Sequence, residues 1–145
     1  LKKQSKINAS GLDVTITEGH NYDLFSIADL ALATSGTVTL EAALCDLGSV
    51  IVYKASPISF FIAKLVVKIP HIGLPNIVAG KGVLPELLQD DFSPENVAKQ
   101  AMELLEPERN AQMHKDLAYV RERLGEAGAV ERVAKLILRL IEDKK

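Results

Sequence analysis

Two short apolar runs on either side of a helical pattern constrain the fold of this chain most strongly. Residues 30–33 read Leu-Ala-Leu-Ala and residues 50–53 read Val-Ile-Val-Tyr. Continuous apolar runs are typical of parallel strands that are covered on both faces. Between them, apolar residues recur at helical spacing over residues 40–47, and we expect Gly48 to end this helix in the left-handed conformation. Strand, helix and strand with short connections predict a right-handed βαβ unit and an α/β fold.

The rest of the chain is predicted to be mainly helical. Residues 14–17 are β-branched and predict a short strand, whereas the prolines and glycines of residues 69–82 predict an irregular loop. Residues 85–89 predict one turn of helix. Further helices are expected over residues 21–28, 57–68, 94–105, 107–124 and 130–141. We therefore expect a Rossmann-like domain over residues 1–106, followed by a helical tail over residues 107–145.

Composition excludes several classes of protein. The chain has 145 residues and a formal net charge of −2, so it lacks the basic excess typical of nucleic-acid binders. Its single cysteine, Cys45, excludes an intramolecular disulfide, fits a reducing cytoplasm and is expected to be a small core side chain. His20, His71 and His114 lack metal-ligand spacing, and we assign no metal. Because the sequence begins at Leu1 without a signal-like segment, we interpret it as a piece of a longer protein.

A small polar turn follows the first apolar run and is the strongest candidate site. Ser35, Gly36 and Thr37 lie between the carboxyl end of a predicted parallel strand and the start of a helix. In open α/β sheets ligands bind at this place, and a helix N-terminus suits a phosphate or diphosphate. Glu41, one turn later, suits the two hydroxyls of a ribose. The alternative is an empty helix start with Ser35 as N-cap and Glu41 as a surface residue.

Two later segments offer weaker signals. Asn76 lies in the predicted loop, and Glu86 and Gln89 lie in the predicted turn that follows. An amide pairs a donor with an acceptor and so suits sugar recognition, although an Asn can also simply close a turn, and Glu or Gln can solvate a helix end. Residues 59–68 are apolar with two lysines, which fits a core helix with snorkelling lysines or a contact with a membrane or acyl chain.

Four blocks of sequence together resemble the lipid-A-disaccharide synthases. They span residues 29–90, in the order and spacing of that family. The blocks are Ala-Thr-Ser-Gly-Thr at 33–37 with Leu-Glu-Ala-Ala at 40–43, Val-Tyr-Lys at 52–54 with Ser-Pro at 56–57, Leu-Pro-Asn-Ile at 74–77 with Ala-Gly at 79–80, and Pro-Glu-Leu-Leu-Gln at 85–89. From residue 91 onward the chain fits the family only as a helical pattern.

The resemblance implies the C-terminal half of a GT-B glycosyltransferase, here without its first strand and helix. The implied reaction transfers 2,3-diacylglucosamine from UDP-2,3-diacylglucosamine to 2,3-diacylglucosamine 1-phosphate, with inversion and release of UDP. The lipid acceptor is expected on a missing N-terminal domain. The C-terminal helices of residues 107–145 are expected to pack on the present domain, on that missing domain or on a partner chain. The family's Gly-Ser-Arg motif and its acidic general base lie upstream of Leu1, so we expect no catalytic residue here and no activity of the chain alone. No cofactor and no metal are implied, and a homodimer and a peripheral inner-membrane contact stay open.

The resemblance also implies roles for individual side chains. The implied donor-binding residues are Ser35, Gly36, Thr37, Glu41, Asn76, Glu86 and Gln89. By this analogy the first three hold the diphosphate, the fourth takes the ribose hydroxyls, and the last three face the donor sugar or its phosphates.

Three positions depart from the family pattern. Lys54 and Lys81 stand where arginine is expected, which keeps the charge but loses the bidentate fork, and His71 replaces an expected tyrosine. Two alternatives to this family also stay open. One is another GT-B enzyme, such as a UDP-N-acetylglucosamine 2-epimerase or a peptidoglycan-precursor transferase, and the other is a non-catalytic α/β interaction module.

Overall fold

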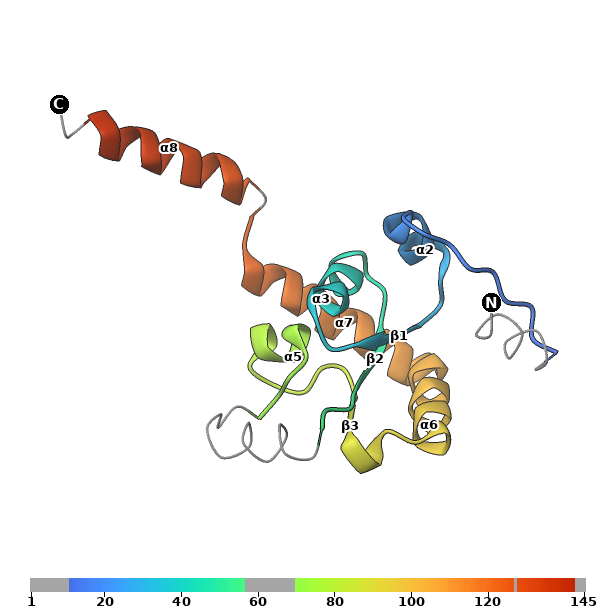
Figure 1. Ribbon diagram of the computed structural model, residues 1–145. Helices are drawn as coiled ribbons and strands as arrows, with labels where there is room; N and C mark the ends of the chain where they lie inside the picture. The colour runs from blue at the N-terminus through green and yellow to red at the C-terminus, as the bar shows by residue number, and fades with distance from the viewer. Residues whose placement is uncertain (1–10, 57–69, 127, 143–145) are drawn as a thin grey trace.

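The computed structural model describes residues 11–56, 70–126 and 128–142 and contains a three-stranded parallel sheet (Figure 1). Its strands are β1 (Ala31–Thr34), β2 (Ser49–Tyr53) and β3 (Glu86–Leu88), in the spatial order β1-β2-β3. Helix α3 (Thr37–Leu44) connects β1 to β2. The expected β-α-β unit and the α/β fold class are thus confirmed.

Central strand β2 lies at the heart of the core. Val50 and Ile51 are 0% exposed, because neighbouring strands cover both edges and helices cover the faces. Helix α7 (Pro107–Leu124) supplies three fully buried side chains to the same core, namely Met113, Leu117 and Val120. The first helix of the expected tail therefore packs on the sheet domain itself.

The remaining elements surround this core. They are α2 (Asn21–Ile27), α5 (Leu74–Ala79), the 3₁₀ turn η1 (Gln89–Asp91), α6 (Pro94–Leu105) and α8 (Ala129–Glu142). Helix α6 begins as predicted, because the Ser93 side chain accepts a hydrogen bond from the Asn96 N–H and Pro94 occupies the first turn. Its Leu104 is 1% exposed and joins the core.

The end of α3 differs from the expectation. The left-handed residue is Asp46, at φ 63°, two positions before Gly48. Gly48 is needed for another reason: a Cβ placed on it would lie 2.0 Å from Met113 Sδ. Close approach of α7 to the start of β2 therefore requires glycine at this position.

Asp46 also ties α3 to α7. Its carboxylate accepts from Arg121 at 2.9 Å and lies 3.0 Å from Nδ1 of His114. Partial desolvation acts to raise the pKa of Asp46, but the hydrogen bonds from Arg121 and His114, with their charges, outweigh it and hold the pKa below its ordinary value. Arg121 additionally donates to the Ala43 carbonyl near the C-terminus of α3.

Four local expectations were wrong. Residues 14–17 form no strand, residues 74–79 form helix α5 inside the expected loop, and residues 86–88 form β3 instead of a helical turn. Cys45 is exposed, since it follows α3 on the outside of the domain. The expected helix over residues 57–68, including the apolar segment with two lysines, lies outside the described residues.

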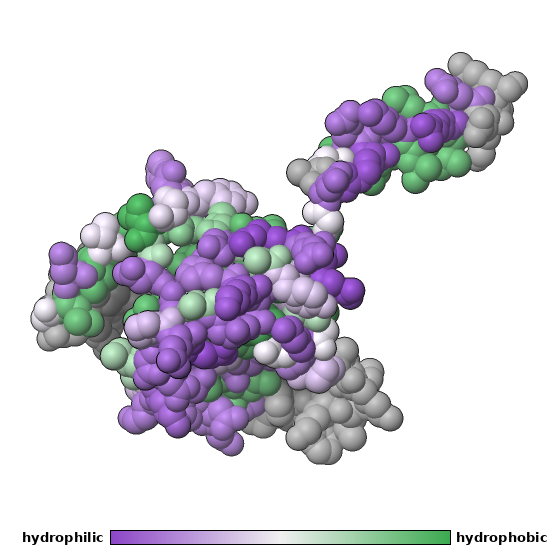
Figure 2. All heavy atoms as spheres, turned by 180° about the vertical axis from the view of Figure 1, so that it is seen from behind, coloured by the Kyte–Doolittle hydropathy of each residue, from purple (hydrophilic) through white to green (hydrophobic). Residues whose placement is uncertain are grey.

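Helix α8 projects away from the rest of the domain (Figure 1), and none of its residues is buried. Figure 2 shows apolar spheres along one side of it and polar spheres along the other. Its exposed large apolar residues are Val130, Val133, Leu136, Ile137, Leu138, Leu140 and Ile141. Among the helices of the described ranges, none has the length and apolarity needed to cross a membrane.

Candidate functional site

The carboxyl ends of the three parallel strands bring the predicted site segments to one edge of the sheet. Ser35 directly follows β1, and its N–H donates to the Val52 carbonyl of β2 at 3.2 Å. Exposed Lys54 follows β2, and Gln89 follows β3. This edge is where open α/β sheets bind ligands.

One of the two sequence interpretations made Ser35 the N-cap of α3, and the structure does not place it there. Gly36 is the N-cap residue, and α3 begins without a side-chain cap. The Ser35 hydroxyl instead donates to the Ile72 carbonyl at 2.9 Å, across 37 residues of sequence. The turn after β1 is therefore fastened to the segment that precedes α5.

Among the residues that the structure describes, no side chain caps the N-terminus of α3. A Cβ placed on Gly36 would have the Thr34 carbonyl oxygen as its nearest atom, at 3.9 Å, so the fold itself leaves room for a side chain there. No acidic residue lies in the first turn, and Gly36 and Thr37 are exposed. The first N–H groups of a helix lack intrahelical acceptors and carry the positive end of the helix dipole. This end of α3 is thus suited to an anion.

Glu41 lies one turn further along α3 and is partly buried. Its Oε2 accepts a hydrogen bond from the Tyr22 hydroxyl at 3.4 Å. Tyr22 belongs to α2, a helix with no buried residue, so this contact links α2 to α3. Tyr22 could not be predicted as part of the site, because nothing in its local sequence pattern indicates a partner 19 residues away.

Asn76 has no free hydrogen-bonding group. It is 1% exposed, and its Oδ1 accepts from the N–H groups of Val83 and Leu84 at 2.8 and 2.9 Å. Its Nδ2 donates to the Leu84 carbonyl at 2.8 Å and to Oε1 of Glu86 at 2.6 Å. Both amide protons and both lone pairs are therefore used within the protein. The side chain organises the return of the chain from α5 to β3.

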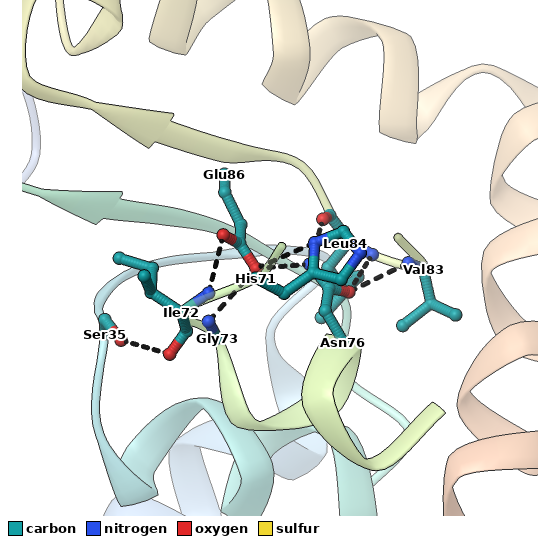
Figure 3. A network of polar contacts seen from close by, with 8 residues as sticks. All are labelled: Ser35, His71, Ile72, Gly73, Asn76, Val83, Leu84 and Glu86. Carbon is teal, nitrogen blue, oxygen red and sulfur yellow. Dashed lines mark hydrogen bonds and ion pairs between the residues drawn. The ribbon is translucent and has the colours of Figure 1, made fainter. Parts of the chain in front are cut away.

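Glu86 is held by the backbone before α5 (Figure 3). Its Oε2 accepts from the Ile72 N–H and its Oε1 from the Gly73 N–H, each at 3.0 Å. Nδ1 of His71 lies 3.7 Å from Oε1, and the Glu86 side chain is 9% exposed. The carboxylate thus sits at the amino end of α5, where negative charge is favoured. Glu86 thus binds backbone at a helix start, and its side chain is largely buried there and does not face solvent.

Gln89 also bonds to backbone. Its Oε1 accepts from the Ala55 N–H at 2.8 Å, and its Nε2 donates to the Ala55 carbonyl at 3.3 Å. The backbone of Gln89 is left-handed, at φ 52°. The side-chain amide therefore replaces a peptide group and prolongs the contact between the β2 and β3 segments beyond the last strand pair, Tyr53 and Leu88.

Lys81, the second position where the resemblance expects arginine, is bound to α7. Its Nζ lies 2.9 Å from the Asp116 carboxylate and 5.3 Å from the centre of the Tyr119 ring. The charge thus fastens the end of α5 to α7. In the ranges 11–56, 70–126 and 128–142, His, Cys, Asp and Glu side chains form no group of three that could hold a metal ion.

Comparison with known proteins identifies the family of this chain. A family model described as lipid-A-disaccharide synthetase matches residues 1–139. The lipid-A-disaccharide synthase of Geobacter sulfurreducens is 43% identical over 134 residues, which are 92% of this chain and 35% of that protein. The synthase of Trichlorobacter lovleyi is 46% identical over 132 residues, or 90% of this chain and 34% of that protein. The chain thus spans about a third of the length of these relatives. It belongs to the lipid-A-disaccharide synthetase family.

Proposed function

We propose that this chain is the donor-binding part of a glycosyltransferase of lipid A biosynthesis. The proposed reaction transfers 2,3-diacylglucosamine from UDP-2,3-diacylglucosamine to 2,3-diacylglucosamine 1-phosphate. A bond forms between an acceptor hydroxyl oxygen and the anomeric carbon, and the bond from that carbon to the diphosphate oxygen breaks. The hydroxyl gives its proton to the general base expected upstream of Leu1, and UDP leaves with the electron pair of the broken bond. The observation that carries the proposal is the open N-terminus of α3 at the carboxyl edge of the sheet, in a chain that belongs to this family.

In this proposal the diphosphate lies at the start of α3. Backbone N–H groups of Gly36, Thr37 and Val38, with the Thr37 hydroxyl, donate to its oxygens and stabilise the charge that develops on the leaving group. The absence of an acidic residue in the first turn favours an anion there. Ser35 contributes by holding the turn, because its hydroxyl proton is bonded to the Ile72 carbonyl.

Glu41 is proposed to accept from the ribose hydroxyls. It projects from α3 one turn beyond the diphosphate position and is only partly buried. Among the described residues its side chain has one weak partner, the Tyr22 hydroxyl at 3.4 Å. A carboxylate has about four acceptor positions, so this contact leaves capacity for a diol.

Asn76, Glu86 and Gln89 receive different roles in the proposal from those that the resemblance implies. Their polar atoms are bonded within the protein, and Asn76 is almost fully buried. A buried amide that leaves its partners exposes unsatisfied backbone groups, which costs about 1–3 kcal/mol for each group. We therefore assign these three residues to shaping the site and not to contacting the sugar.

Substituting Gly36→Ala tests the diphosphate position. Because an added methyl group meets only ordinary van der Waals contact, we expect an unchanged melting temperature. The methyl group occupies the space above the α3 amides, so UDP affinity should fall by about tenfold or more, or about 1.4 kcal/mol. Isothermal titration calorimetry and thermal unfolding measure the two quantities. Wild-type affinity for UDP in a folded variant would contradict the proposed position.

Ser93→Ala is the matched control at another helix start. It removes the N-cap of α6, so it should destabilise the fold by about 1 kcal/mol and leave UDP affinity unchanged. Gly36→Ala should therefore change UDP affinity without changing stability, and Ser93→Ala should change stability without changing UDP affinity.

The proposal extends to the partners of the chain. We place the reaction in the cytoplasm at the inner-membrane surface, where we expect the lipid acceptor. We also propose a homodimer that uses the apolar side of α8. Sedimentation of the chain tests the dimer: a monomer at micromolar concentration, together with binding to lipid vesicles, would assign this side of α8 to the membrane instead.

A further inference from the structure

We propose that Glu86 is a positioning residue for the donor site. It acts through the backbone N–H and carbonyl of Ile72 on Ser35, and so on the start of α3. This inference rests on the proposed function, because it assigns a purpose to a network that adjoins the proposed diphosphate position. Figure 3 shows its path from β3, through the segment before α5, to the turn after β1.

The first link is the carboxylate of Glu86. Three donors converge on it: the N–H groups of Ile72 and Gly73 at 3.0 Å each, and the Asn76 amide at 2.6 Å. With both oxygens engaged and only 9% of the side chain exposed, the carboxylate has a fixed orientation. Hydrogen bonds that involve a charged partner are roughly twice as strong as neutral ones, so this link is stiff.

The second link is residue Ile72, whose two backbone groups point to different partners. Its N–H donates to Glu86 and its carbonyl accepts from the Ser35 hydroxyl at 2.9 Å. The adjoining Gly73 keeps this segment close, because a Cβ there would lie 2.4 Å from Ile51 Cδ1 and 3.1 Å from Glu86 Oε1. The position of the Ile72 carbonyl is thus set by contacts with β2 and β3.

The third link is Ser35 itself. Its N–H is bonded to β2 and its hydroxyl proton to Ile72, so both its donors are committed. Gly36, the next residue, begins α3. The direction of the first α3 amides is therefore fixed from two sides before any ligand arrives, which reduces the ordering that binding requires.

Glu86 does not act as a direct ligand of the donor in this account. To bind the nucleotide sugar, the Glu86 carboxylate would have to give up hydrogen bonds from three groups of the protein. In addition, a carboxylate is not favoured beside a negatively charged diphosphate. The carboxylate occupies the amino end of α5, so in this account the anion binds at the start of α3.

A double-mutant cycle on UDP affinity tests the inference. Glu86→Gln turns one acceptor oxygen into an NH₂ group that faces backbone N–H donors, so the Ile72 segment should shift and UDP binding should weaken about tenfold. Ser35→Ala breaks the same path at its other end and should weaken binding about fivefold. Because both act through Ile72, the double variant should bind no more than about twofold more weakly than Glu86→Gln alone.

Glu41→Ala provides the control pair. Glu41 is proposed to contact the ribose directly, so its effect and that of Glu86→Gln should multiply. A folded Glu86→Gln variant with wild-type UDP affinity, or full multiplication with Ser35→Ala, would overturn the positioning role.

Free-protein NMR separates this inference from the proposed function. Ser35→Ala should shift the amide resonances of Ile72 and Gly73 in the absence of ligand. This measurement does not need the Glu86→Gln variant, so it tests the inference even if that variant fails to fold. Unchanged resonances would overturn the inference. Absence of UDP binding to the wild-type chain would instead overturn the proposed function.

Discussion

The side-chain amide of Asn76 donates to the carboxylate of Glu86 across 2.6 Å, which joins α5 to β3 directly beneath the candidate site. The same amide bonds three backbone groups of Val83 and Leu84. A single buried side chain thus closes the connection between α5 and β3 and holds the Glu86 carboxylate in place.

Asn76→Asp should destabilise the fold strongly at neutral pH. The new oxygen would face both Glu86 Oε1 and the Leu84 carbonyl in a site that is 1% exposed, so we expect a loss of about 3 kcal/mol or more. Urea unfolding of the variant and the wild type at about pH 7 measures the loss.

Asn96→Asp is the matched control, because its amide bonds only the Asp91 carbonyl in an exposed position. It should cost less than about 1 kcal/mol. Equal effects of the two substitutions would show that burial of Asn76 does not matter.

Gly48→Ala should destabilise the domain by about 1–3 kcal/mol, since overpacked cores lose stability by this amount. The added methyl group would lie 2.0 Å from Sδ of Met113, which is itself fully buried. In a Met113→Ala background the conflict disappears, so the same substitution should cost much less there. Additive losses in denaturant unfolding would argue against the close contact of α7 with β2.

Removal of two fully buried hydroxyl groups, those of Ser49 and Thr39, should change the stability of the fold in different ways. Ser49 Oγ has no hydrogen-bond partner among the described residues, whereas Thr39 Oγ1 donates to the Gly36 carbonyl at 2.8 Å. Ser49→Ala should therefore be neutral or stabilising, and Thr39→Val should cost about 1 kcal/mol. Urea midpoints of the two variants provide the comparison. A loss for Ser49→Ala as large as that for Thr39→Val would reveal a missed partner of Ser49.

Asp46→Asn should lower stability above about pH 4 and leave it unchanged at lower pH. Asn also tolerates the left-handed backbone of this residue, so the substitution isolates the charge. The folded-state pKa of Asp46 is lowered, so its stabilisation is present above the unfolded pKa and is lost as the pH falls through the folded value. About half the side chain is exposed, which limits the effect through solvent screening to under about 1 kcal/mol. Unfolding of the variant and the wild type between about pH 2 and about pH 6 tests this pH dependence. A stability difference between the two that stays constant across that range would contradict the role of the Asp46 charge.

The sequence predicts the elements whose local pattern and tertiary setting agree. The β1-α3-β2 unit, α6 with its Ser93 cap, α7 and α8 all combine a clear periodicity with suitable ends. Helix α5 was not predicted, because proline and glycine are also the residues that interrupt regular structure. They mark its ends instead: Pro75 lies in the first turn and Gly80 is the left-handed C-cap at φ 69°. That asymmetry is present in the sequence.

Other features depend on contacts that no local pattern contains. Residues 86–88 have strong helix formers, yet they form a strand because the free edge of β2 offers hydrogen-bond partners, beginning at Ile51. The roles of Asn76, Glu86 and Gln89 likewise come from backbone groups 7 to 34 residues away in sequence. The sequence singles out these three residues for a role in donor binding, which stays a prediction, and it gives no signal for their internal partners.

Calorimetric titration of the chain with UDP, with ADP as the control, tests the central claim most directly. The account predicts saturable UDP binding, at about millimolar Kd or tighter, and at least about tenfold weaker binding of ADP. Equal affinity for the two nucleotides, or heat of dilution alone for both, would contradict a donor site at the start of α3.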